Sequence, residues 1–97
     1  MIRYEDRKRI YAHAIDRWGV KGQLLMVIEE MSELTKEICK SFRGTDNLEQ
    51  IADETADVMI MLEQLRMILG LDDMIREHMD RKIMRLADRL DIEVEEA

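Results

Sequence analysis

The chain has 97 residues, a length that predicts one domain and excludes a multidomain protein. Its 22 acidic and 15 basic residues give a net charge of −7, which argues against a nucleic-acid partner because such a surface needs a basic patch. The composition predicts an all-α fold, because the chain has no proline, only four glycines, and nine methionines among many other strong helix formers.

The single cysteine, Cys39, excludes an internal disulfide and predicts a reducing, cytoplasmic location. Its neighbours Ile38 and Phe42 favour a small buried hydrophobe over a reactive thiol, since free cysteine is among the most buried residue types. No signal peptide or apolar run of membrane-spanning length is recognisable, so we expect no membrane partner.

Four segments carry apolar residues at helical spacing. The first is expected to end at Gly19 and the third at Gly70, because glycine is favoured just beyond a helix end. A short joint at residues 20–22 is expected after the first segment. The predicted helices cover about residues 4–18, 23–42, 46–69 and 73–89, with an acidic tail at 91–97. The sequence therefore predicts a single all-α domain over residues 1–97, with ordered helices from about residue 4 to residue 90.

The turn between the second and third helices contains Gly44, which can adopt a positive φ. Asp46 followed by Glu49 predicts a capping box at the start of the third helix. Asp72 or Asp73 is expected to cap the fourth helix.

Two pairs of acids flank this turn: Glu30 and Glu33 before it, and Glu54 and Asp57 after it. The members of each pair are three residues apart, so they share a helix face. Glu33 lies nine residues before Phe42, where its helix should end, and Glu54 lies eight residues after the predicted cap of the next helix. In an antiparallel hairpin, Glu33 and Glu54 would sit at the same height, and Glu30 would meet Asp57 one turn further on.

Four converging carboxylates repel one another unless a cation neutralises them. A hard divalent ion suits this role, and Mg²⁺ fits best because it takes oxygen ligands and commonly bridges carboxylates to phosphates. A di-iron bundle would need a Glu-x-x-His motif, which neither histidine supplies.

A simpler alternative is a solvated acidic face, in which Glu33 and Glu37 pair with the nearby Lys36 and Lys40. The pair on the third helix differs, because no basic residue lies three or four positions from Glu54 or Asp57. This favours the metal site over the solvated face.

The acids form the pattern E-E-x-x-E, followed after a gap of twenty residues by E-x-x-D. This pattern resembles that of the MazG-like, all-α nucleoside triphosphate pyrophosphohydrolases. The resemblance covers roughly residues 20 to 90. The resemblance implies a four-helix bundle with an antiparallel central hairpin, completed as a homodimer or homotetramer. It also implies cleavage of a ribo- or deoxyribonucleoside triphosphate to the monophosphate and pyrophosphate, in nucleotide-pool control or house-cleaning.

The resemblance further implies one or two Mg²⁺ ions, for which Mn²⁺ can substitute, held by Glu30, Glu33, Glu54 and Asp57. Glu29 matches the first acid of the motif, and we expect it to orient a ligand from outside the coordination sphere.

Four basic residues are candidates for binding the substrate's phosphates, although each is also explained as a solvated surface cation: Lys36, Lys40, Lys82 and Arg85. Trp18 is most simply a core or subunit-contact residue, and its ring is also a candidate for stacking on the nucleobase. The preferred base and sugar stay open.

The alternative function is a non-enzymatic helical interaction module, oligomeric through its apolar stripes and docking a basic partner on its acidic face. A relative that binds nucleotides without cleaving them is a third reading.

Overall fold

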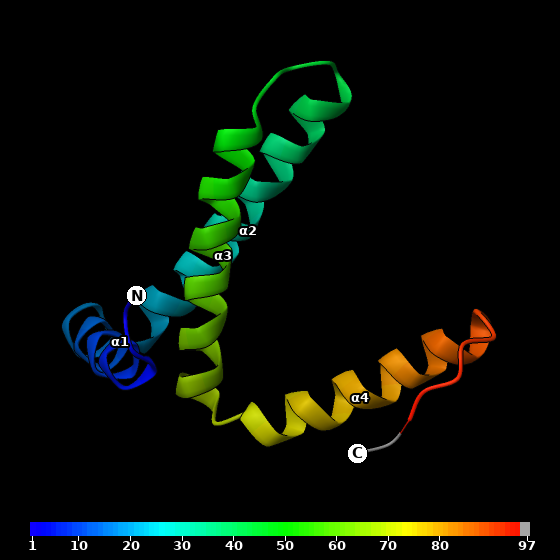
Figure 1. Cartoon of the computed structure of the whole chain (residues 1–97). Helices are drawn as coiled ribbons and strands as arrows, with labels where there is room; N and C mark the ends of the chain where they lie inside the picture. Colours follow the sequence, from blue (N-terminus) through cyan, green and yellow to red (C-terminus); the bar gives the residue numbers. More distant parts are fainter. Residues whose placement is uncertain (96–97) are drawn as a thin grey trace.

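A computed structural model describes residues 1–95, which form four α-helices and no strand (Figure 1). This confirms the predicted all-α class and the number of helices. The last part of the expected acidic tail, residues 96–97, lies outside the described residues. The helices are α1 (Tyr4–Trp18), α2 (Val20–Phe42), α3 (Leu48–Leu69) and α4 (Asp72–Arg89).

Glycines end two of the helices, as the sequence predicts. Gly19 has a φ of 84° and follows α1, and Gly70 has a left-handed φ of 62° and follows α3. The expected joint at residues 20–22 is wrong, because α2 already begins at Val20. One residue suffices for this corner because glycine adopts a positive φ without a steric penalty.

The predicted helix caps are wrong. The N-cap of α3 is Asn47, one residue after Asp46, and its side chain makes no capping hydrogen bond. The N-cap of α4 is Leu71, so Asp72 and Asp73 lie inside the first turn. Acids there still interact favourably with the positive end of the helix dipole.

The α2–α3 pair is the central feature of the fold, and its two helices pack antiparallel along each other (Figure 1). Val27 of α2 and Val58 and Met61 of α3 are buried in this hairpin. Helix α1 packs near the start of α2, where Tyr11 is buried and Arg7 forms an ion pair with Glu63 of α3 at 3.2 Å. The hairpin therefore carries most of the core.

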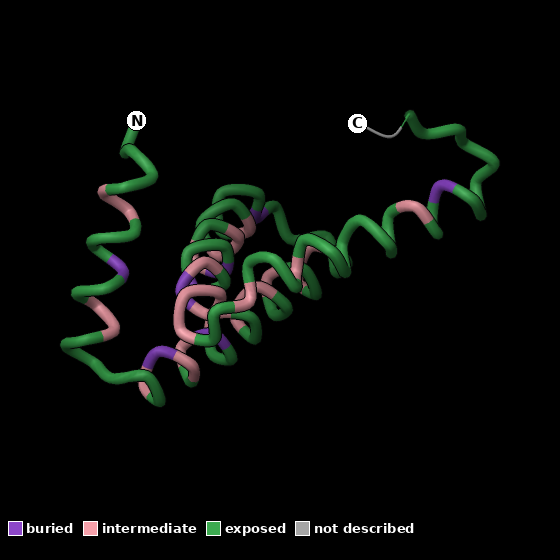
Figure 2. Tube along the Cα trace, turned by 90° about the horizontal axis from the view of Figure 1, so that it is seen from below, coloured by how far each residue is buried: buried purple, intermediate pink, exposed green. Residues whose placement is uncertain are grey.

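Helix α4 projects away from the hairpin, and most of its length is exposed (Figures 1 and 2). The radius of gyration is 16.7 Å, whereas a compact domain of this length has about 12.5 Å. Cys39, expected to be buried, is exposed on α2, because its side of that helix faces away from α3. No helix within residues 1–95 is both long enough and apolar enough to cross a membrane.

Candidate metal centre

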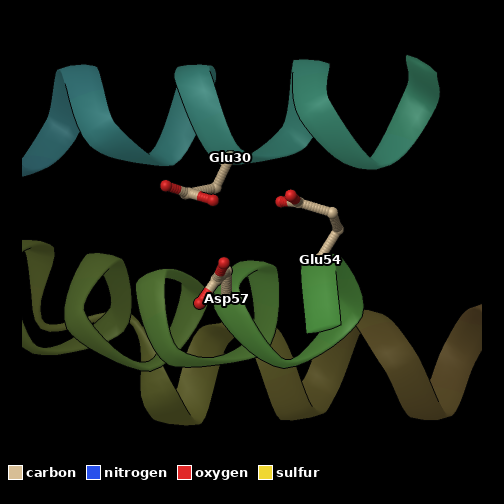
Figure 3. Close-up of side chains that lie close together, drawn as sticks. All are labelled: Glu30, Glu54 and Asp57. Atoms are coloured by element: carbon tan, nitrogen blue, oxygen red, sulfur yellow. The ribbon is translucent and has the colours of Figure 1, made fainter. Parts of the chain in front are cut away.

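Three carboxylates from the two helices of the hairpin converge in its interior. Glu30 of α2 points toward Glu54 and Asp57 of α3 (Figure 3). One oxygen from each of the three residues lies within 4.8 Å of the others, and all three side chains are half-buried. The height match between Glu30 and Asp57 that the sequence predicts is therefore present.

The electrostatics of this cluster are unfavourable for three negative charges. The pKa of Glu30 is raised, first by its burial and then by the charges of Asp57 and Glu54. The pKa of Glu54 is raised too, first by burial and then by the charges of Asp57 and Glu33. The carboxyls of Glu30 and Glu54 thus hold their protons more tightly than an ordinary glutamate does.

The donor set suits a hard divalent cation. The Oε2 atom of Glu54 is buried and has no hydrogen-bond partner, so one acceptor in the cluster lacks a positive or donating neighbour. None of the ion pairs formed within residues 1–95 involves these three acids. A cation such as Mg²⁺, which prefers carboxylate oxygens, would satisfy the unpaired oxygen and relieve the repulsion.

Two of the candidate catalytic acids lie beside this cluster rather than in it. Glu33, a candidate ligand, is half-buried on α2 but is not one of the converging three. Its charge nevertheless raises the pKa of Glu54. Glu29 is exposed, and its charge raises the pKa of Glu30, which is an effect from outside the cluster.

The four candidate phosphate-binding residues lie in two separate places. Lys36 is exposed on α2, and Lys40 forms an ion pair with Glu37 at 3.1 Å. Lys82 and Arg85 are exposed on α4, which projects away from the hairpin (Figure 1). Of these four candidates, only Lys36 and Lys40 lie on the same hairpin as the carboxylates.

Trp18 lines an open hollow of about 480 Å³ at the other end of the hairpin. The hollow is also lined by Gly22, Gln23, Met26, Met61 and Gln64. Gln23 donates a hydrogen bond from Nε2 to Oε1 of Gln64 at 2.6 Å, and these side chains are only 5% and 4% exposed. Two buried amides thus stand in an otherwise apolar pocket beside an exposed aromatic ring.

The hollow and the carboxylate cluster lie on the same side of the hairpin. Gln23 comes seven residues before Glu30, and Gln64 comes seven residues after Asp57. Seven residues are two helical turns, so each glutamine lies on the face of its acid and about 10 Å along the helix axis. Sequence analysis missed both glutamines, although this seven-residue spacing from the acids was a signal.

Asn47 ties the end of α2 to the start of α3 and was also missed. Its Nδ2 donates hydrogen bonds to the backbone oxygen of Glu37 at 2.8 Å and to Oε1 of Glu37 at 3.0 Å. The pKa of Glu37 lies below its usual value, mainly because of the hydrogen bond from Asn47 and secondly because of the one from Lys40. This link fixes how α2 and α3 align, and so which acids face each other.

Comparisons with known protein families, with curated proteins and with solved structures found no match. The function is therefore inferred from the residues of the site.

Proposed function

We propose that the protein is a Mg²⁺-dependent nucleoside triphosphate pyrophosphohydrolase of the MazG-like kind. The observation that carries this proposal is the convergence of Glu30, Glu54 and Asp57 around a buried carboxylate oxygen that has no partner. The acid pattern of the sequence supports the same assignment. The reaction adds water across the bond between the α- and β-phosphates and yields a nucleoside monophosphate and pyrophosphate.

Glu30, Glu54 and Asp57 would hold the metal, and Glu33 would join them after rotation of its side chain. When bound, Mg²⁺ or Mn²⁺ supplies the positive charge that a polyphosphate needs and promotes the attack of water. The chain's own acids contribute negative charge at a fixed position, which creates affinity for the cation. Glu29 acts on Glu30 through its charge, which raises the pKa of Glu30, and it is not proposed as a metal ligand.

The hollow beside Trp18 is the proposed site for the nucleobase. The exposed indole offers a face for stacking, and the two amides retain donors and acceptors for a base edge after pairing with each other. The distance of about 10 Å to the acids leaves room for a ribose and the first phosphates. Lys36 and Lys40 are the proposed contacts for the outer phosphates.

The proposed enzyme works as a homo-oligomer in the cytoplasm and acts on nucleotide pools. Lys82 and Arg85 contribute to phosphate binding in this proposal only if α4 of a neighbouring copy reaches the hairpin. Neither residue is needed for the metal centre itself.

The test is pyrophosphate release from a panel of ribo- and deoxyribonucleoside triphosphates, with Mg²⁺ and with a chelator. We expect metal-dependent release with the monophosphate as the second product. Glu54→Gln should lower turnover at least 100-fold while helicity is kept, and Glu49→Gln, on an exposed position of the same helix, should leave turnover unchanged. No release from any nucleotide by the folded protein would favour the interaction module with an acidic docking face instead.

A further inference from the structure

A small pocket of about 150 Å³ lies between α1, the last part of α3 and the start of α4. Three basic side chains line it, Arg7 and Lys8 from α1 and Arg66 from α3. Glu63 and Asp72 line it too, so three positive charges meet two negative ones and one positive charge is in excess. The local charge is therefore opposite in sign to the net charge of −7 of the whole chain.

The two acids hold the two arginines in place. The Nε atom of Arg7 donates a hydrogen bond to Oε2 of Glu63 at 3.2 Å, and Nε of Arg66 donates to Oδ1 of Asp72 at 2.9 Å. Nε carries only one of the five N–H donors of an arginine. Each acid thus fixes the position of a guanidinium group and leaves the donors of its terminal nitrogens for another acceptor.

Tyr4 keeps the two cations of α1 close together. The centroid of its ring lies 5.5 Å from Cζ of Arg7 and 5.5 Å from Nζ of Lys8. Cations at this distance are attracted by the face of an aromatic ring, which offsets part of their mutual repulsion. Lys8 forms no ion pair within residues 1–95, so its ammonium group has no carboxylate partner there.

Tyr11 adds a neutral donor to the lining of the pocket. It is 6% exposed, and its pKa is raised, first by its burial and then by Glu63. The phenol therefore keeps its proton at neutral pH and can donate a hydrogen bond. The donors around the pocket thus come from two helices and include charged and neutral groups.

This pocket is separate from both parts of the proposed nucleotide site. Arg66 comes nine residues after Asp57, which is about 13.5 Å along α3. Trp18 comes eleven residues after Arg7, which is about 16 Å along α1. A ligand in the pocket would therefore contact neither the carboxylate cluster nor the indole.

The size and the donors of the pocket select its occupant. Pockets for drug-sized ligands measure about 300 to 1,000 Å³, so a volume of about 150 Å³ suits a group of only a few atoms and excludes a nucleoside. A carboxylate has two oxygens, which a single guanidinium group can bind with two parallel hydrogen bonds. A phosphate group offers at least three oxygens, and it therefore matches three cations that approach from two helices.

We propose that this pocket binds one phosphate group between Arg7, Lys8 and Arg66, either as inorganic phosphate or as part of a phosphorylated small molecule. The site goes beyond the proposed function, because it uses none of the residues assigned to the metal or the nucleotide. A bound phosphate joins α1 to α3. Through the ion pair of Arg66 with Asp72, it also stabilises the corner from which α4 leaves the hairpin.

The test is equilibrium dialysis of radiolabelled inorganic phosphate against the full chain, at constant ionic strength and with a chelator. The chelator removes divalent metal, so the result does not depend on the metal centre or on pyrophosphate release. We expect saturable binding of about one phosphate per chain below about 10 mM. Glycerol phosphate is the competitor: if it displaces the label at lower concentration than unlabelled phosphate does, the ligand is a phosphorylated small molecule, and otherwise it is free phosphate.

Lys8→Gln removes one cation of the pocket without breaking an ion pair. Arg9→Gln is its matched control, because Arg9 is exposed on the same helix, does not line the pocket and also carries one positive charge. We expect Lys8→Gln to weaken phosphate binding at least about fivefold, since it removes a hydrogen bond between charged groups. Arg9→Gln should change the affinity less than about twofold, and circular dichroism checks that both variants are folded.

Backbone amide signals in nuclear magnetic resonance locate the site without any substitution, which covers the case in which Lys8→Gln fails to fold. Phosphate should shift the signals of Arg7, Lys8 and Arg66 and leave those of Glu30 and Asp57 in place. The absence of saturable binding to the folded wild type would overturn the proposal. So would an equal loss of affinity in Lys8→Gln and Arg9→Gln, or phosphate-induced shifts that miss Arg7, Lys8 and Arg66.

Discussion

Replacing Gln64 with methionine tests how the two buried amides contribute to stability and to recognition. The substitution keeps an unbranched side chain of similar length and removes the acceptor of the 2.6 Å bond from Gln23. Gln23 then stays 5% exposed with an amide that has lost its partner. The lost bond costs about 1 kcal/mol and the orphaned amide at least about 1 more, so we expect a total loss of about 2 kcal/mol.

The double variant Gln23→Met/Gln64→Met should behave differently. With both amides gone, no buried polar group is left unsatisfied, and methionines at both positions extend the apolar lining formed by Met26 and Met61. We expect it to lose less than about 1 kcal/mol, because replacing both partners by apolar groups is nearly neutral. Each single variant loses about 2 kcal/mol, so the coupling energy of the pair is about 3 kcal/mol.

Thermal unfolding, with all variants at the same protein concentration, measures this cycle, because any self-association would make the midpoint depend on concentration. A loss of 2 kcal/mol corresponds to about 8 to 16 °C for a chain of this size. Pyrophosphate release supplies a second readout, in which the stable double variant should still lose at least tenfold in kcat/KM. Stability losses that simply add in the double variant would refute the coupling between the two buried amides. A wild-type kcat/KM in the double variant would refute their role in binding the nucleobase.

Three further results are expected. In metal-free buffer the raised pKa values of Glu30 and Glu54 mean that the folded state binds extra protons, so the unfolding midpoint should rise as the pH falls from about 7 toward about 5. Glu37, whose pKa is lowered, loses its stabilising effect only at more acidic pH and does not mask this rise. Glu54→Gln should make this rise smaller, and its metal-free unfolding midpoint at pH 7 should equal or exceed that of the wild type. A midpoint well below the wild-type value would contradict the repulsion between the carboxylates. Asn47→Asp should lower the unfolding midpoint by about 5 °C or more and raise the pKa of Glu37, because the new carboxylate cannot donate either hydrogen bond. An unchanged urea unfolding curve would exclude a stabilising role for Asn47.

The four helices were predictable because their signals are local. Apolar spacing and the glycines at positions 19 and 70 depend only on neighbouring residues. The meeting of Glu30 with Asp57 was predictable too, since counting residues from a turn fixes their heights in an antiparallel pair. Glu33 behaves differently because height alone does not determine the rotation of a side chain around its helix.

Contacts between distant residues were not predictable from local patterns. Asn47 looked like one more turn residue, yet its amide is held by Glu37, ten positions earlier, rather than by its own helix. The Gln23–Gln64 pair spans 41 positions, and the only signal for it was the seven-residue spacing of each glutamine from its acid. The apolar stripes of α2, α3 and α4 were recognisable, but a stripe does not say whether its partner lies in the same chain.

The polar interior of the hairpin gives a physical reason for its apolar exterior. Between α2 and α3, the seam holds Asn47 with Glu37 near the turn, then the carboxylates, then the two glutamines. Between these polar layers the buried hydrophobic residues of the two helices are Val27, Val58 and Met61, so the contact of the two helices alone provides a small core. A binding site placed inside a two-helix seam therefore leaves apolar side chains of the hairpin exposed on its outside, among them Ile28, Met31 and Met59.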